Sequence, residues 1–126
     1  MTFRKNDDME LLEQMADAAL KRDSLLLRSL VQDFVRSGVP AGNLPRPNTT
    51  EPSILAVSAA LAELLALRQG QTSPDWTQEI GALAEPFFLV ESAISMKRLR
   101  FLCETQSPEP LRKRQLYAPP HFLEFA

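Results

Sequence analysis

Arg114 and His121 are the residues of this sequence whose types and spacing most resemble a reactive pair. They are separated by six residues, in the pattern R-x6-H. Such a pair could place a cation and a base near the 2′-hydroxyl of an RNA. A two-residue pattern arises often by chance, however. The favoured interpretation is therefore a solvated Arg114 and an ordinary tail residue at His121.

Other catalytic chemistry lacks the side chains that it needs. A serine or cysteine nucleophile usually requires a nearby base, and the sequence has one histidine. Catalytic zinc generally takes three protein ligands rich in histidine or cysteine, and this chain offers one of each. The four glycines are scattered and form no phosphate-binding loop. We therefore expect no catalytic residue, no metal and no cofactor.

The spacing of Arg114 and His121 resembles that of a class of all-helical ribonucleases, the HEPN-type toxins, whose domains are of similar size. The resemblance implies a helical ribonuclease in which these two residues are catalytic. The sequence departs from the pattern at Pro119-Pro120, because these prolines break the helix that would normally present the histidine. This ribonuclease stays an alternative hypothesis.

Basic residues gather late in a chain whose net charge is −2. The overall charge argues against general attraction to nucleic acid or to acidic membranes, and no aromatic-rich RNA-binding motif is interleaved with the cations. Nucleic acid is therefore an unlikely partner, whereas an acidic protein surface remains open. The cluster comprises Lys97, Arg98, Arg100, Arg112, Lys113 and Arg114.

Hydrophobic periodicity predicts an all-α fold, a small helical bundle in one domain covering residues 1–126. Regular amphipathic helices are expected at about 7–21 and 24–37, followed by a helix at about 50–69 that is apolar nearly all round. We interpret the third helix as the centre of the bundle, capped by Thr49 or Thr50. A further helix is predicted at about 92–104, with Ile94 among its core residues.

The part after residue 70 reads differently, as short elements interrupted by prolines and carrying most of the aromatic side chains. Phe87 to Val90 is either a short strand or an extended segment. Large apolar side chains on irregular segments pack as a lid on their own bundle, which is the commoner case, or dock on another protein. Candidate docking residues are the apolar anchors Trp76, Phe87, Phe88, Tyr117 and Phe122 and the cations Arg112, Lys113 and Arg114. Phe122, Leu123 and Phe125 would form a compact anchor behind the stiff Pro119-Pro120.

Several stretches of this second part resemble a group of small bacterial proteins. They are residues 74–80, 85–88, 98–100, 104–112 and 116–123, so the resemblance covers roughly residues 74–126 and leaves the N-terminal helices unmatched. Some members of that group are encoded beside nucleotidyltransferase-like genes, in arrangements that look like toxin–antitoxin pairs. The resemblance implies an antitoxin-like protein whose partner is a nucleotidyltransferase-like toxin, and it implies no catalytic residue.

The sequence therefore favours a non-enzymatic protein-interaction module that binds and occludes a partner protein. The alternatives are the ribonuclease described above and a self-associating helical protein in which the apolar third helix lies at a homodimer contact. No stretch reads as a secretion signal or a membrane span, and the single Cys103 suits a reducing compartment. The expected location is the cytoplasm.

Overall fold

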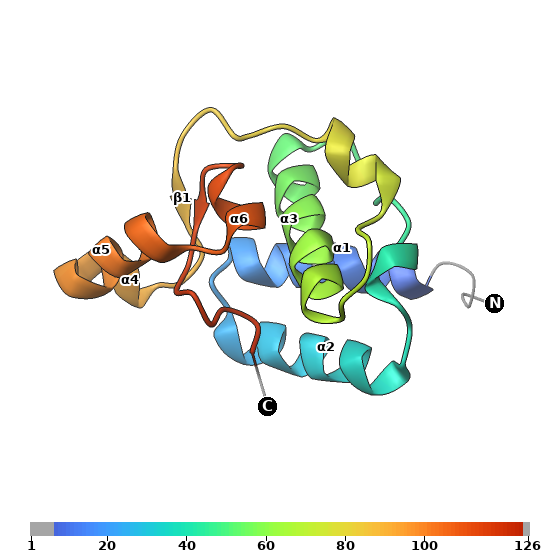
Figure 1. The fold of residues 1–126 in the computed structure, drawn as a ribbon. Helices are drawn as coiled ribbons and strands as arrows, with labels where there is room; N and C mark the ends of the chain where they lie inside the picture. The colour runs from blue at the N-terminus through green and yellow to red at the C-terminus, as the bar shows by residue number, and fades with distance from the viewer. Residues whose placement is uncertain (1–6, 125–126) are drawn as a thin grey trace.

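The computed structural model describes residues 7–124, and within this range the chain is mostly helical, as predicted. The α-helices are α1 (Asp7–Leu20), α2 (Ser24–Ser37), α3 (Pro52–Arg68), α4 (Ser92–Ser95), α5 (Lys97–Gln106) and α6 (Glu109–Arg112). Two 3-10 helices, η2 (Ala41–Asn43) and η3 (Asp75–Glu79), and two short strands, β1 (Phe87–Phe88) and β2 (Leu116–Tyr117), complete the fold. Figure 1 shows α1 and α2 running in opposite directions, with α3 crossing in front of α1, and α1 packs against both other helices.

The corner between α1 and α2 is built without a glycine. Backbone hydrogen bonds from Arg22 N to Ala19 O (3.1 Å) and from Asp23 N to Ala18 O (2.9 Å) end α1. Arg22 takes the left-handed conformation there, with φ +57°. Asp23 then caps α2, because its side chain accepts a hydrogen bond from Leu26 N at 3.1 Å.

Helix α2 ends where the sequence predicts, but it is less buried than its periodicity indicates. Gly38, with φ +76°, supplies the left-handed residue that closes the helix. Leu27, Val31 and Phe34 are buried, whereas Val35, which follows Phe34 directly, is exposed. Only one narrow stripe of α2 therefore faces the bundle.

Helix α3 is the centre of the bundle, as its composition predicts. Of its 17 residues, 12 are buried. The expected cap is wrong, because the N-cap is Glu51, without a side-chain hydrogen bond, while Pro52 begins the helix. The hydroxyl of Thr49 instead accepts a hydrogen bond from Glu51 N at 3.2 Å. Glu51 is the N-cap residue, so this bond does not satisfy a backbone N–H of the first turn of the helix.

The loop before α3 is tied to the segment after it. Gln69 accepts a hydrogen bond from Ala41 N at 2.9 Å, and the Trp76 indole donates to Leu44 O at 2.8 Å. A Cβ at Gly42 would lie 2.5 Å from Thr72 O, so this close backbone approach requires glycine. These contacts hold η2 and η3 against α3.

Phe87-Phe88 forms a strand, which settles the alternative that the sequence left open. It pairs in parallel with β2, Phe87 opposite Leu116 and Phe88 opposite Tyr117. The helix expected at 92–104 is two helices, because Met96 is extended (φ −99°, ψ 107°) and separates α4 from α5.

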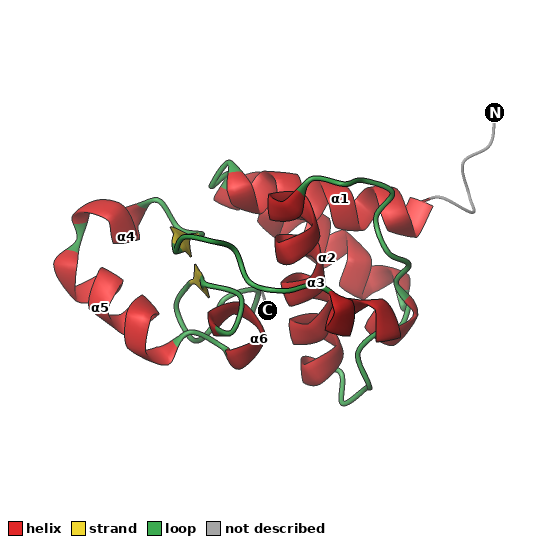
Figure 2. Cartoon of the chain, turned by 90° about the horizontal axis from the view of Figure 1, so that it is seen from above, coloured by secondary structure: helices red, strands yellow, loops and turns green. Residues whose placement is uncertain are grey.

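Seen from above, α4 and α5 lie at one end of the molecule and α1–α3 at the other, with the two strands and α6 between them (Figure 2). We refer to residues 92–106 as the α4–α5 arm. The arm has a small core of its own, centred on Phe88, Ala93 and Cys103, separate from the main core of the bundle. No helix within residues 7–124 has the length and apolar character needed to cross a bilayer.

Candidate protein interface

Arg114 lies in the interior of the molecule, paired with Glu63 of α3. The two side chains are joined by two parallel hydrogen bonds of 2.9 Å, from Nη1 to Oε1 and from Nη2 to Oε2. Only 2% of Arg114 and 7% of Glu63 are exposed. Such a bidentate geometry fixes both the distance and the orientation of the two groups. It therefore joins α3 to the loop that follows α6.

The remaining donors of Arg114 bind backbone carbonyls. Nη2 donates to Thr77 O at 2.8 Å, Nη1 to Pro110 O at 3.0 Å and Nε to Ile80 O at 3.3 Å. Each of the three guanidinium nitrogens thus has a partner, drawn from η3, α6 and the segment after η3. The guanidinium holds the proline-rich second part of the chain on the bundle.

The Glu63 carboxylate has a second cation, because Lys113 Nζ lies 3.0 Å from Oε1. Burial raises the pKa of the Glu63 carboxyl, but the hydrogen bonds from Arg114 and Lys113 lower it by more, so the net pKa is below its ordinary value. Glu63 is therefore held as a carboxylate at neutral pH.

Arg114 is therefore neither solvated nor available to a partner, and both expectations are corrected by its burial. It also does not join His121. His121 is exposed and lines an apolar pocket to which Arg114 contributes nothing. The R-x6-H spacing thus does not assemble a site in this fold, because Glu63 occupies the guanidinium.

The aromatic anchors expected at a partner surface pack largely against the protein itself. Phe88 and Phe122 are buried, while Trp76, Phe87 and Tyr117 are half-buried. The rings of Phe88 and Tyr117 lie 5.4 Å apart, and the guanidinium of Arg22 covers Phe87 at 4.5 Å. These side chains form the lid, which corrects their assignment as exposed anchors. Phe125 lies outside the described residues.

The other two expected cations are exposed, but each has an internal contact. Lys113 binds Glu63, as described above. Arg112 donates from Nη1 to Thr105 O at 3.4 Å, at the end of α5. Arg112 therefore contacts the arm, whereas Lys113 contacts the bundle.

The arm carries three of the exposed large apolar side chains of the described residues; the others are Leu25, Leu26 and Val35 on α2 and Leu67 on α3. Phe101 is 66% exposed, Met96 56% and Ile94 50%, so the expectation of a buried Ile94 is wrong. Two cations on the first turn of α5, Lys97 and Arg98, have no side-chain hydrogen bond or ion pair within residues 7–124. The arm therefore combines apolar anchors with cations that the protein does not neutralise.

Helical spacing places these groups on one face. Phe101 follows Arg98 by three residues and Lys97 by four, the separations at which helix side chains are neighbours. The opposite face of α5 is fixed, since Cys103 is fully buried and Arg100 lies over the Phe88 ring at 5.0 Å. A rigid aromatic side chain flanked by two cations suits contact with an acidic surface.

Burial also affects the chemistry of the arm's cysteine. It raises the pKa of the Cys103 thiol, and the charge of Glu104 raises it further. The thiol is thus held protonated inside the arm's core. Within residues 7–124, no three histidine, cysteine, aspartate or glutamate side chains gather to hold a metal ion.

Comparison with models of known protein families, with curated proteins and with solved structures finds no match to this chain.

Proposed function

We propose that this protein is a non-enzymatic interaction module that binds an acidic partner protein through the α4–α5 arm. The observation that carries the proposal is the exposed Phe101 ring beside the unneutralised Lys97 and Arg98. Interface hot spots are commonly large side chains that enter a desolvated pocket on the partner. Phe101 is the anchor, and Met96 and Ile94 widen the apolar contact around it.

The two cations set which partner fits. Lysine and arginine beside an apolar anchor steer an acidic surface into contact and disfavour basic surfaces. Because the cations have no internal counter-ion, binding an acidic partner does not require an existing ion pair to break. Association should therefore be fast at low salt and slower as ionic strength rises.

The resemblance of residues 74–126 to antitoxin-like proteins supplies a candidate for this partner. A nucleotidyltransferase-like enzyme carries acidic residues at its active site, which would complement Lys97 and Arg98. Occlusion of that site by the arm would restrain the enzyme without any chemistry by this chain. Its location in the cytoplasm is part of the same proposal.

Co-expression with the product of the adjacent open reading frame tests the proposal. A stable complex that elutes as one species in size-exclusion chromatography, and that dissociates as salt is raised, is the expected result. Separate elution of the two proteins at low salt would refute this choice of partner. Elution of the pure chain as a homodimer through α3 would favour the self-associating alternative instead.

A further inference from the structure

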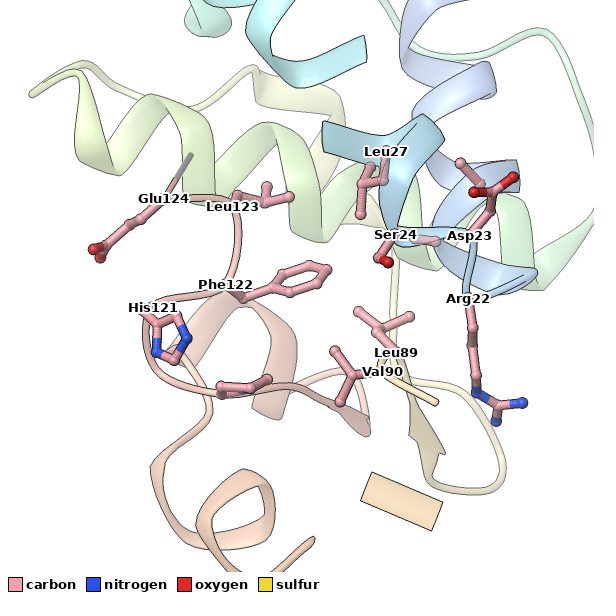
Figure 3. A pocket seen from close by; sticks show the side chains of 13 residues that line it. Arg22, Asp23, Ser24, Leu27, Leu89, Val90, His121, Phe122, Leu123 and Glu124 are labelled. Atoms are coloured by element: carbon pink, nitrogen blue, oxygen red, sulfur yellow. The ribbon is translucent and has the colours of Figure 1, made fainter. Parts of the chain in front are cut away.

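An apolar pocket of about 250 Å³ lies between the α1–α2 corner, the segment after β1 and the residues that follow Pro119 (Figure 3). It is on a different part of the molecule from the exposed side chains of the arm. Its walls include Leu27, Leu89, Val90, Phe122 and Leu123. An apolar cavity of about 150 Å³ is large enough to hold benzene, so this pocket has room for a somewhat larger ring system.

The backbone of two of its walls is held in an unfavourable conformation. Three non-glycine residues within the described chain have positive φ, and two of them, Arg22 (φ +57°) and Leu123 (φ +69°), line this pocket. Such conformations persist only where the surroundings enforce them, and they gather at ligand sites. Here the Nε of Arg22 donates to Phe88 O at 2.8 Å.

The wall that contains Leu123 is fixed by Arg68 of α3. Its guanidinium donates to Phe122 O and, at 3.3 Å, to Pro120 O. The same guanidinium pairs with Glu124 at 3.6 Å. The pocket is therefore shaped before any ligand arrives, which lowers the entropic cost of binding.

Charged groups around the pocket are already engaged. Asp23 caps α2, Glu124 pairs with Arg68, and Arg22 binds Phe88 O while it covers the Phe87 ring. A charged ligand would have to leave water for an apolar space whose lining carboxylates and guanidinium are engaged elsewhere, with only the exposed His121 at its edge, and that transfer is costly. The pocket therefore suits an uncharged molecule.

One polar group does face the pocket without a partner. Figure 3 shows the Ser24 hydroxyl directed toward the space between Leu27, Leu89 and Phe122. Within the described part of the chain this hydroxyl makes no hydrogen bond. A hydroxyl can accept or donate, so it can bind one polar group on an otherwise apolar ligand.

We propose that this pocket binds a small uncharged aromatic molecule that carries a single hydrogen-bonding group, held by packing against the apolar walls, which include the Phe122 ring, and by the Ser24 hydroxyl. Indole is a suitable probe, because it has two fused rings and one N–H. Its analogue indole-3-carboxylate has the same rings and adds the negative charge that the pocket does not neutralise.

Titration of the isotope-labelled protein with each probe, followed by amide resonances, tests the inference. Indole should shift the resonances of residues that line the pocket, with a dissociation constant on the order of 1 mM. Indole-3-carboxylate should bind at least about tenfold more weakly. Ser24→Phe places a ring in the mouth of the pocket from an exposed position and should abolish the shifts. Ser29→Phe makes the same change at another exposed residue of α2 and should leave them intact.

The absence of indole shifts at the lining residues would overturn the inference. So would equal binding of the two probes, or binding that survives Ser24→Phe. If Ser24→Phe disturbs the fold, Val90→Phe fills the pocket from the opposite wall and must give the same loss. None of these results depends on the proposed partner of the arm.

Discussion

Replacing Arg114 by methionine should lower the free energy of unfolding by about 3–5 kcal/mol. The substitution keeps much of the side-chain volume and removes the cation. It leaves the Glu63 carboxylate, only 7% exposed, with Lys113 as its remaining partner. The lysine is itself half-exposed, so it compensates in part and places the expected cost toward the lower end of this range.

The pair can be separated from its surroundings by a double-mutant cycle. Glu63→Leu alone strands a guanidinium that is 2% exposed, which should also cost about 3–5 kcal/mol. The double variant Glu63→Leu, Arg114→Met has no buried charge, but Thr77 O, Pro110 O and Ile80 O lose their donor. Its cost should be about 1–3 kcal/mol, far below the sum of the two single changes.

Urea denaturation followed by tryptophan fluorescence measures these values, because Trp76 is the only tryptophan and is half-buried. If either single variant fails to fold, the double variant should restore folding. Additive costs, or a cost below about 1 kcal/mol for Arg114→Met, would show that the buried pair does not hold the second part of the chain on the bundle.

The same pair predicts how stability depends on pH. The folded-state pKa of Glu63 is below the ordinary value of 4.5, because the hydrogen bonds from Arg114 and Lys113 outweigh the effect of burial. The resulting stabilisation is present above about pH 4.5 and is lost as the pH falls through the lower folded-state pKa. The Glu63→Gln variant should therefore lose less stability than the wild-type protein as the pH is lowered. The urea midpoint measured as a function of pH tests this, and an equal decrease in acid for the two proteins would contradict the reasoning.

Three further predictions follow from single residues. The Arg22→Gly variant should be more stable than the Arg22→Ala variant by about 1 kcal/mol. Both variants lose the hydrogen bond to Phe88 O, but only glycine adopts the positive φ of this position without strain, and equal urea midpoints would contradict this. Ser58→Ala should raise stability by about 1 kcal/mol, since the buried Ser58 hydroxyl has no partner in the described chain, and a lower melting temperature would refute it. Cys103 should react with a thiol reagent at pH 8 at least about tenfold more slowly in the native protein than in the urea-unfolded protein, because its thiol is buried and has a raised pKa. Equal rates would show that the core of the arm is open to the reagent.

The helical half of the fold was predictable because local signals agree with tertiary packing there. The helix expected at 24–37 is α2 (Ser24–Ser37), bounded by the capping Asp23 and the left-handed Gly38. The composition of α3, with no polar face, requires burial on all sides, and the structure provides it. Where a segment is long and its apolar residues recur at helical spacing, its secondary structure can be predicted without knowing what packs against it.

The candidate site could not be read in the same way, because its decisive contacts join distant residues. Glu63 and Arg114 are 51 positions apart, and no local pattern shows that the two will meet. Arg22 occupies a left-handed position that usually signals itself by glycine. Phe101 was one aromatic residue among several, and only the burial of the others within residues 7–124 distinguishes it as a well-exposed phenyl ring.

The break between α4 and α5 was missed for a related reason. Met96 has good helix propensity, so the sequence predicts one continuous helix over 92–104. Packing of Ala93 and Cys103 into one small core bends the chain at Met96 and turns Ile94 outward. Tertiary packing outweighs local propensity here, and it creates the exposed surface on which the proposed function depends.

The affinity of the protein for the product of the adjacent open reading frame, measured for Phe101→Ala and for Leu67→Ala, tests the role of the arm most directly. Both residues are large, apolar and well exposed, but Leu67 lies at the end of α3, away from the arm. If the arm is the interface, Phe101→Ala should weaken binding by about 30-fold or more, the effect of losing a hot spot of about 2 kcal/mol, while Leu67→Ala leaves the dissociation constant unchanged. Equal affinities for the two variants would contradict binding through the arm.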